Sequence, residues 1–356
     1  MKDKVIMEIS EKKARIRELW QLCFHDDEQF VDLLFGHLYR DENALCFEER
    51  GVLTSALQML PYQMTYGSSV VGVSYISGAA TRPEYRNRGL MGRLLRESFE
   101  TMRSRAIPLS ALIPAEPWLY GYYATKGYAP VFFRRESHFT AVHRFEGAGY
   151  RRVIPSPDRL YSFFDTQMRR RPCCMLHARN DFEVICGDNR LDGGEVIALA
   201  DEAGELSALA FAVPHDDGTR VKELLAVDDR AREATLHEVE RAFPDQPVTV
   251  VMPPDSREGV LQCMGMMRIV DVPAMLLTVA QNHPSLLVVV RVSDPLLPAN
   301  EGVYRIADGA CGRIEADTCD FDVDVAELTL LVFGDSHQDS LVDFPAMPPY
   351  MSLMLD

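Results

Sequence analysis

Apolar and polar positions follow two different periods in the stretch between residues 71 and 130. Residues 71–81 are rich in valine and small side chains and predict a strand. After a turn that contains Pro83, apolar residues recur at i, i+3 and i+4 and predict a helix, with a stripe formed by Met91, Leu94, Leu95, Ser98, Phe99 and Met102. Residues 108–113 predict the next strand, and residues 118–126 predict a short helix. The order strand, turn, helix, strand, helix indicates an α/β unit.

The same pattern analysis predicts regular structure in the rest of the chain. Helices are expected within residues 11–34 and at residues 231–243, and residues 323–333 are expected to be helical or mixed. The expected strands lie at residues 44–47, 52–59, 64–75, 134–143, 224–227, 248–252, 286–292, 301–308 and 312–316. The fold class is therefore α/β (α+β), with mixed sheets flanked by helices.

A chain of 356 residues is long enough for two or three domains. Glycine and proline gather between residues 146 and 157, which places a boundary there. The segment that follows repeats the earlier order of strand, helix, strand, proline and glycine, with spacings of 13 residues (127−114) and 12 residues (265−253). It supplies no glycine turn and adds carboxylates at residues 228–233, so the copy is expected to have lost its chemistry. The predicted domains are residues 1–145, 146–281 and 282–356.

Composition narrows the class of protein. A formal net charge of −16 argues against a nucleic-acid binder, which needs a basic surface. The charge suits a cationic substrate, and plain solubility explains it equally well. No apolar run reaches the length of a membrane span, the N-terminus is charged, and the eight cysteines form no C-x-x-C pair, so we expect a cytoplasmic protein with reduced thiols. The nine histidines show no metal-ligand spacing, and no metal is expected.

The turn before the predicted helix carries the strongest chemical signal. Arg86, Asn87, Arg88 and Gly89 stand at a helix start, where backbone N–H groups lack partners and the helix dipole is positive. Glycine lets an anion approach the backbone closely. The turn is neither a Walker loop nor a G-x-G-x-x-G loop. It indicates a phosphate or pyrophosphate cradle, and a capped helix with a solvated basic turn is the alternative.

Two motifs together resemble the GNAT (GCN5-related N-acetyltransferase) family. Arg86 and Gly89 match the family's pyrophosphate motif between a strand and a helix, although Met91 replaces its usual glycine or alanine. The segment from Tyr123 to Gly127-Tyr128 is similar to the family's Tyr-x-x-x-Gly-Tyr/Phe segment. The Met91 departure and the three-part layout resemble the Eis (enhanced intracellular survival) branch. That branch joins a catalytic GNAT domain, a degenerate GNAT domain and a sterol-carrier-like domain. The resemblance is close over residues 1–140 and looser beyond.

The resemblance implies that acetyl-CoA is the co-substrate. The strand end would hold the pantetheine through its backbone, and the turn and helix start would hold the pyrophosphate. The expected binding residues are Ala79, Ala80, Thr81, Arg86, Asn87, Arg88, Gly89, Leu90, Met91 and Gly92.

Acetyl transfer also needs a proton donor and a base. A phenol is protonated at neutral pH and can protonate a leaving thiolate. By resemblance Tyr123 is the donor, with Tyr120, one helical turn earlier, as its competitor. The C-terminal segment is apolar enough to be buried, and by resemblance the main-chain carboxylate of Asp356 is the base. An edge strand that ends at the surface is the alternative.

The expected function is transfer of an acetyl group to a primary amine by direct attack in a ternary complex. Aminoglycosides, polyamines and peptide lysines remain open as acceptors, and the acidic residues Asp26, Asp27, Glu28 and Asp32 are candidates for binding the amine. A non-catalytic acyl-CoA-binding or lipid-binding protein on the same fold is the rival. No nucleic-acid or membrane partner is expected. The resemblance also implies a homo-oligomer, a trimer or a hexamer.

Overall fold

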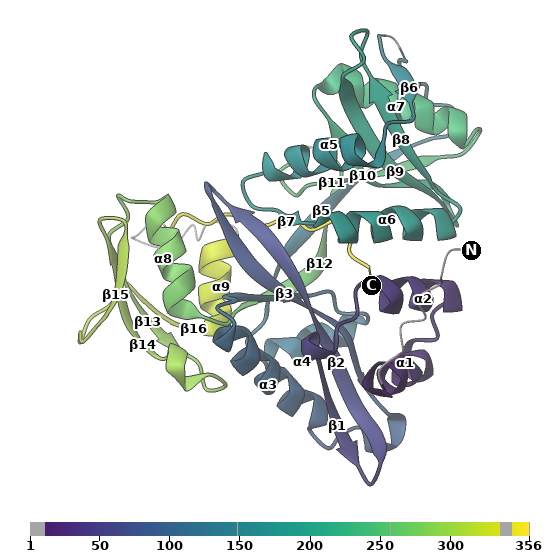
Figure 1. The fold of residues 1–356 in the computed structure, drawn as a ribbon. Helices are drawn as coiled ribbons and strands as arrows, with labels where there is room; N and C mark the ends of the chain where they lie inside the picture. The colour runs from purple at the N-terminus through teal and green to yellow at the C-terminus, as the bar shows by residue number, and fades with distance from the viewer. Residues whose placement is uncertain (1–10, 148, 257, 335–343, 356) are drawn as a thin grey trace.

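The computed structural model describes residues 11–147, 149–256, 258–334 and 344–355, which form three packed units (Figure 1). In the first unit, helices α1 and α2 come before the strands in the chain and lie on one side of the sheet. Helices α3 and α4 lie on the other side. Its elements are α1 (Glu11–Phe24), α2 (Glu28–His37), η1 (Asp41–Asn43), β1 (Ala44–Glu49), β2 (Val52–Tyr66), β3 (Ser69–Thr81), η2 (Pro83–Tyr85), α3 (Leu90–Ser104), β4 (Leu109–Leu112), α4 (Pro117–Ala124) and β5 (Ala129–Phe139).

The second unit repeats the strand–helix–strand arrangement. Strands β10 and β11 are parallel and joined by α7, as β3 and β4 are joined by α3. Its elements are β6 (Arg151–Val153), α5 (Pro157–Arg169), β7 (Met175–Leu176), α6 (Arg179–Leu191), β8 (Glu195–Ala200), β9 (Leu206–His215), β10 (Gly218–Ala226), α7 (Asp229–Ala242), β11 (Val248–Met252) and β12 (Val260–Ile269).

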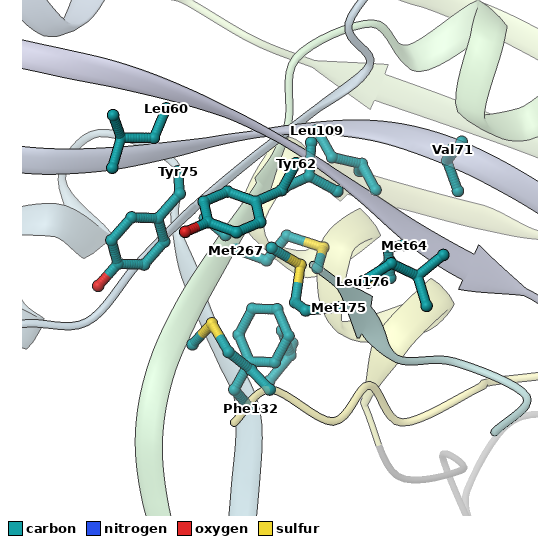
Figure 2. Packing of buried hydrophobic residues seen from close by; sticks show 14 of the residues in the cluster. Leu60, Tyr62, Met64, Val71, Tyr75, Leu109, Phe132, Met175, Leu176 and Met267 are labelled. Carbon is teal, nitrogen blue, oxygen red and sulfur yellow. The ribbon is translucent and has the colours of Figure 1, made fainter. Parts of the chain in front are cut away.

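The two units exchange their last strands and thereby share one sheet. Strand β12 pairs antiparallel with β4 and β5, and β5 continues past β12 to pair antiparallel with β11. The order within the described residues is β1-β2-β3-β4-β12-β5-β11-β10-β9-β8-β6, with β7 on the far end of β2. The buried side chains at this junction come from β2, β3, β4, β5, β7 and β12 (Figure 2). The core therefore ties the first unit to the unit that follows it.

The third unit is a small, mostly antiparallel sheet with one buried face, against which helices α8 and α9 pack. Helix α8 packs on β14 and β15, and α9 packs against both β16 and the exchanged strands β5 and β12 (Figure 1). The elements are α8 (Val272–Asn282), β13 (Val288–Ser293), η3 (Pro298–Asn300), β14 (Gly302–Ala307), β15 (Ala310–Ile314), β16 (Phe321–Asp324) and α9 (Val325–Phe333). The domain limits stay predictions, and the one expected at 281/282 falls at the end of α8.

Three sequence-based expectations need correction. A strand break was expected between residues 59 and 64, but β2 runs through Pro61, and the chain turns at Gly67 and Ser68, where Gly67 adopts a φ of 56°. The strand expected at 134–143 is β5, which begins at Ala129 because it pairs first with β12. The repeat has no counterpart of α4, since β11 leads through a turn into β12.

Candidate active site

Strands β3 and β4 separate where the resemblance places the pantetheine. They pair in parallel only over Val73–Tyr75, whereas β3 continues to Thr81. On its other side β3 stays paired with β2, up to Thr81 opposite Ser55. The edge of β3 beyond Tyr75 therefore faces no strand within the described residues. Ala79 and Ala80 lie on this edge, and their backbone groups are available to an extended, amide-bearing ligand.

A bulge reshapes the same strand end. The register of β2 and β3 shifts between Ala56 and Gln58, where Gly78 adopts a φ of 59° and the Trp20 ring occupies the space a side chain would need, 2.3 Å from an added Cβ. Nearby, both polar atoms of the Gln58 amide are buried and have no partner among the described residues. A buried amide without a partner is costly and fits a site that a polar ligand completes.

The helix that follows begins without a side-chain cap. Gly89 is the N-cap of α3 with a φ of 72°, and no side chain accepts from the first helical N–H groups. A Cβ added to Gly89 would meet no described atom within 4 Å, so the helix start is open. The first turn contains no acidic residue. This geometry suits the binding of a phosphate group at the positive end of the helix dipole.

Two arginine side chains just before the helix start contact neighbouring groups of the turn. Arg86 Nε donates to the carbonyl of Thr81 at 3.1 Å, which ties the turn to the end of β3. Arg88 donates to the carbonyl of Glu84 at 3.0 Å and stacks over Tyr85, with 4.7 Å between the guanidinium carbon and the ring centre. Both side chains are exposed. The predicted turn therefore combines uncapped N–H groups with two guanidinium groups.

Tyr123, on helix α4, is buried inside the first unit. Its ring contacts Tyr122 and Tyr128 edge-on, with ring centres 5.3 and 5.8 Å apart, in a cluster with Ile76 of β3 and Leu94 of α3. Burial, followed by the neighbouring Tyr122, raises the pKa of Tyr123 to about 12. Its hydroxyl makes no hydrogen bond to another described residue. The phenol is therefore protonated at neutral pH, and no described residue engages its proton.

Tyr120 occupies a different environment on the same helix. It is half-buried beside Cys263 of β12, and burial first, then the Cys263 thiol, raises the pKa of Tyr120. It joins the apolar cluster around Tyr123 only at its edge. The structure thus separates the two candidate donors, one inside the cluster and one against the exchanged strand.

The end of the described chain is buried between the first two units. The backbone of Tyr350 bonds to Cys173 and Met175, the Ser352 hydroxyl donates to Glu223 at 2.6 Å, and the Ser352 carbonyl accepts from His177 Nε2 at 2.9 Å. Figure 1 shows this segment ending between α2 and α6. The expected burial of the segment is confirmed for Tyr350, Met351, Ser352 and Leu355, whereas Asp356 lies outside the described residues.

A cavity of about 600 Å³ lies where this segment ends. Ile113, just past β4, and Met264 of β12 mark its end near the separation of β3 and β4. Of the four acidic candidates, Asp26 and Asp27 line the cavity, whereas Glu28 and Asp32 pair with Arg17 on the helices. The cavity therefore extends from the place expected for the thioester end of acetyl-CoA to the α1–α2 loop.

Other charged residues of the cavity were not predicted. They come from β5, α6 and β10, and comprise Arg134, Asp188, Asp192, Arg220 and Lys222. A signal was present, because Arg134 with Glu136 and Arg220 with Lys222 are pairs of charged side chains at i, i+2 in strands β5 and β10. Such pairs indicate one polar face on a strand. Their meeting at one cavity depends on strand exchange, which local patterns do not show.

These sites define a class of protein, and sequence comparison identifies its domains. Residues 9–131 match the acetyltransferase (GNAT) domain, and residues 273–345 match the sterol carrier protein domain. The chain therefore carries an acetyltransferase (GNAT) domain and a sterol-carrier-like domain, as the resemblance implied. A comparison with curated proteins finds no match.

Solved structures share the whole arrangement. A GCN5-related N-acetyltransferase from Anabaena variabilis matches with a TM-score of 0.77 at 15% identity, over 97% of this chain and 98% of that one. One from Kribbella flavida matches with 0.73 at 20% identity, over 98% and 97%. Eis1 from Mycobacterium abscessus matches with 0.72 at 15% identity, over 90% and 86%. These likenesses confirm the predicted fold, including its Eis-like three-part layout.

No group of three or more His, Cys, Asp or Glu side chains among the described residues is arranged to hold a metal ion. None of the described helices is long and apolar enough to cross a membrane.

Proposed function

We propose that the protein transfers an acetyl group from acetyl-CoA to a primary amine. The observation that carries the proposal is the free edge of β3 beyond Tyr75, which leads directly to the uncapped start of α3 at Gly89. An extended strand edge beside a helix N-terminus suits a ligand with an amide-bearing arm and a diphosphate. The orphaned Gln58 amide beside the bulge supports a polar group at the same place.

Each predicted binding residue then has a role that its position supports. Ala79, Ala80 and Thr81 offer backbone groups to the pantetheine, and residues Asn87 to Gly92 cradle the pyrophosphate. Arg86 and Arg88 add positive charge, which both side chains hold in preset positions. The Thr81 carbonyl already accepts from Arg86, which ties the turn to the end of the strand.

The acceptor amine attacks the thioester directly, with no acyl-enzyme. The cavity beside Ile113 brings it to the end of the acyl donor, and Tyr123 gives a proton to the departing thiolate. The base assigned to Asp356 stays a prediction, because that residue lies outside the described part of the chain. The buried Leu355 before it lines the acceptor cavity.

Calorimetry and a thiol-release assay together test the proposal. Coenzyme A should bind the wild type, and an Arg86→Gln, Arg88→Gln double variant should bind it at least tenfold more weakly, since two charged contacts are lost. A matched Arg305→Gln variant removes a cation from the exposed face of β14 and should bind normally. Acetyl-CoA with a panel of amines should release free thiol. Binding without turnover of any amine would favour the acyl-CoA-binding rival.

A further inference from the structure

The acceptor cavity has a charged sheet wall formed by residues of β5 and β10. Glu136 on β5 is opposite Val251 of β11, and Val251, Arg134, Arg220 and Lys222 all line the cavity. The wall therefore spans three adjacent strands that belong to both α/β units. Its charged side chains form two groups that differ in net charge. The Lys222 group consists of Lys222, Asp188 and Asp192, and the Glu136 group consists of Glu136, Arg134 and Arg220.

The Lys222 group carries excess negative charge. The ammonium lies 2.7 Å from an Asp192 oxygen and 3.4 Å from an Asp188 oxygen. Asp188 on α6 and Asp192 just after its end thus surround one cation. This group has no spare positive charge to offer an acceptor.

The Glu136 group carries excess positive charge. Its carboxylate is 6% exposed and accepts from Arg220 and, at 3.3 Å, from Gln262. Arg134 Nε lies 3.2 Å from the same carboxylate but is not directed for a hydrogen bond. Two guanidinium groups therefore share one carboxylate. The Arg134 guanidinium is partly exposed to the cavity and makes no hydrogen bond to any other described residue.

The α1–α2 loop faces this wall with negative charge. One oxygen of Asp26 accepts from the Trp20 indole at 2.7 Å, and one oxygen of Asp27 caps α2 through the backbone N–H of Gln29 at 2.8 Å. Each carboxylate keeps its other oxygen for a further donor, and both residues are exposed to the cavity. The cavity is therefore acidic at the loop and basic at Arg134.

We infer that the acceptor is an amine that also carries a carboxylate, which Arg134 binds; this inference rests on the acetyl transfer proposed above. A planar guanidinium recognises a carboxylate through two parallel hydrogen bonds. A purely cationic polyamine would place like charge against Arg134, whereas a zwitterion matches both ends of the cavity. Amino acids and short peptides with a free carboxylate belong to this class.

Matched ligand pairs test the inference. Lysine and cadaverine differ by one carboxylate, as do alanine and ethylamine, and each is titrated calorimetrically into wild-type protein saturated with coenzyme A. The carboxylate member of at least one pair should bind about tenfold or more tightly, the ratio expected for a charged hydrogen bond. Arg134→Gln should abolish that preference and leave the amine without a carboxylate within about twofold of wild type, while Arg134→Lys should restore part of it. Arg305→Gln serves as the charge-matched control.

The outcomes separate this inference from the proposed function. Equal or weaker binding of the carboxylate member in both pairs would overturn the inference even if amines are acetylated. A loss of affinity in Arg134→Gln that is the same for both members of a pair would also overturn it. A preserved preference without thiol release would instead overturn the acetyltransferase proposal, because the readout of the inference is binding.

Discussion

Arg268 of the exchanged strand β12 and Asp294 of the sterol-carrier-like unit form a fully buried ion pair. Arg268 Nη2 lies 2.7 and 2.6 Å from the two carboxylate oxygens, and each side chain is 1% exposed. Arg268 Nη1 also donates to the carbonyl of Lys126 at 2.7 Å, in the turn after the Tyr123 helix. Asn300 donates to Asp294 at 2.8 Å and accepts from Arg103, near the end of α3. The third unit therefore holds the ends of both helices of the candidate site.

Removing one partner of this pair should destabilise the protein strongly. Asp294→Ala leaves the Arg268 charge buried without a counter-ion, which costs about 3–5 kcal/mol of unfolding free energy. The double variant Arg268→Met, Asp294→Leu removes both charges and should lose less than Asp294→Ala alone. Urea unfolding of the wild type, Asp294→Ala and the double variant measures their free energies of unfolding. An Asp294→Ala protein as stable as wild type would show that the pair contributes nothing.

Two glycines with similar backbone angles should respond differently to alanine. Gly89 and Gly127 have φ of 72° and 78°, but an added Cβ at Gly89 meets open space, whereas at Gly127 it falls 1.8 Å from Arg268 Nη1. Gly89→Ala should cost about 1–2 kcal/mol of stability from backbone strain. Gly127→Ala should cost more, because it also displaces the buried Arg268. Equal midpoints of urea unfolding would contradict this account of the Gly-Tyr segment.

Tyr123→Phe should lower kcat by about 10²- to 10⁴-fold, the range for loss of a general acid. The ring that packs against Tyr128 is kept, so coenzyme A affinity should change little. Tyr120→Phe is the matched control, since it removes a phenol one helical turn away. Thiol-release kinetics and calorimetry on both variants decide between the two tyrosines: a large loss of kcat confined to Tyr120→Phe would reverse the assignment.

The raised pKa of Tyr123 predicts the shape of the pH profile. The residue acts in its protonated form, and a pKa of about 12 keeps it protonated throughout the neutral and mildly alkaline range. Activity that requires the protonated phenol falls only as pH rises toward 12. The kcat of the wild type should therefore show no decline between pH 7 and 10, measured by thiol release in buffers of constant ionic strength. A decline with a midpoint in that range would exclude Tyr123 as the titrating acid.

Helix α3 was predictable because its pattern depends on its own residues. The stripe predicted on α3 is buried at Leu94, Leu95, Ser98, Phe99 and Met102, and Met91 is half-buried at the edge. The turn at Gly89 was predictable for the same reason, since a glycine that follows the exposed residues Arg86 and Arg88 leaves a local signal.

The acceptor cavity was only partly predictable because its walls meet through distant pairings. Asp26 and Asp27 could be proposed from their place before α2, but Arg134 meets Arg220 only because β5 leaves its own unit and pairs with β11. Arg268 similarly reaches the Lys126 turn because β12 pairs with β4. Antiparallel pairing between strands so far apart in the chain is set by the whole core, and no residue pattern in β5 or β12 alone specifies it.

His177 should make the protein lose stability in mild acid. Burial lowers the pKa of His177 to about 4, and its Nε2 donates to the Ser352 carbonyl while its ring contacts Tyr62 edge-on. Because the unfolded chain binds this proton near pH 6.5, the stability contributed by the neutral ring is complete above pH 6.5 and is lost as pH falls toward 4. The shift corresponds to about 3 kcal/mol over that window. Urea unfolding at pH 7.5, 6, 5 and 4.5 measures the slope, and His177→Gln, which cannot titrate, should flatten it. A wild-type slope identical to that of His177→Gln would show that other groups govern the acid sensitivity of the segment that closes the acceptor cavity.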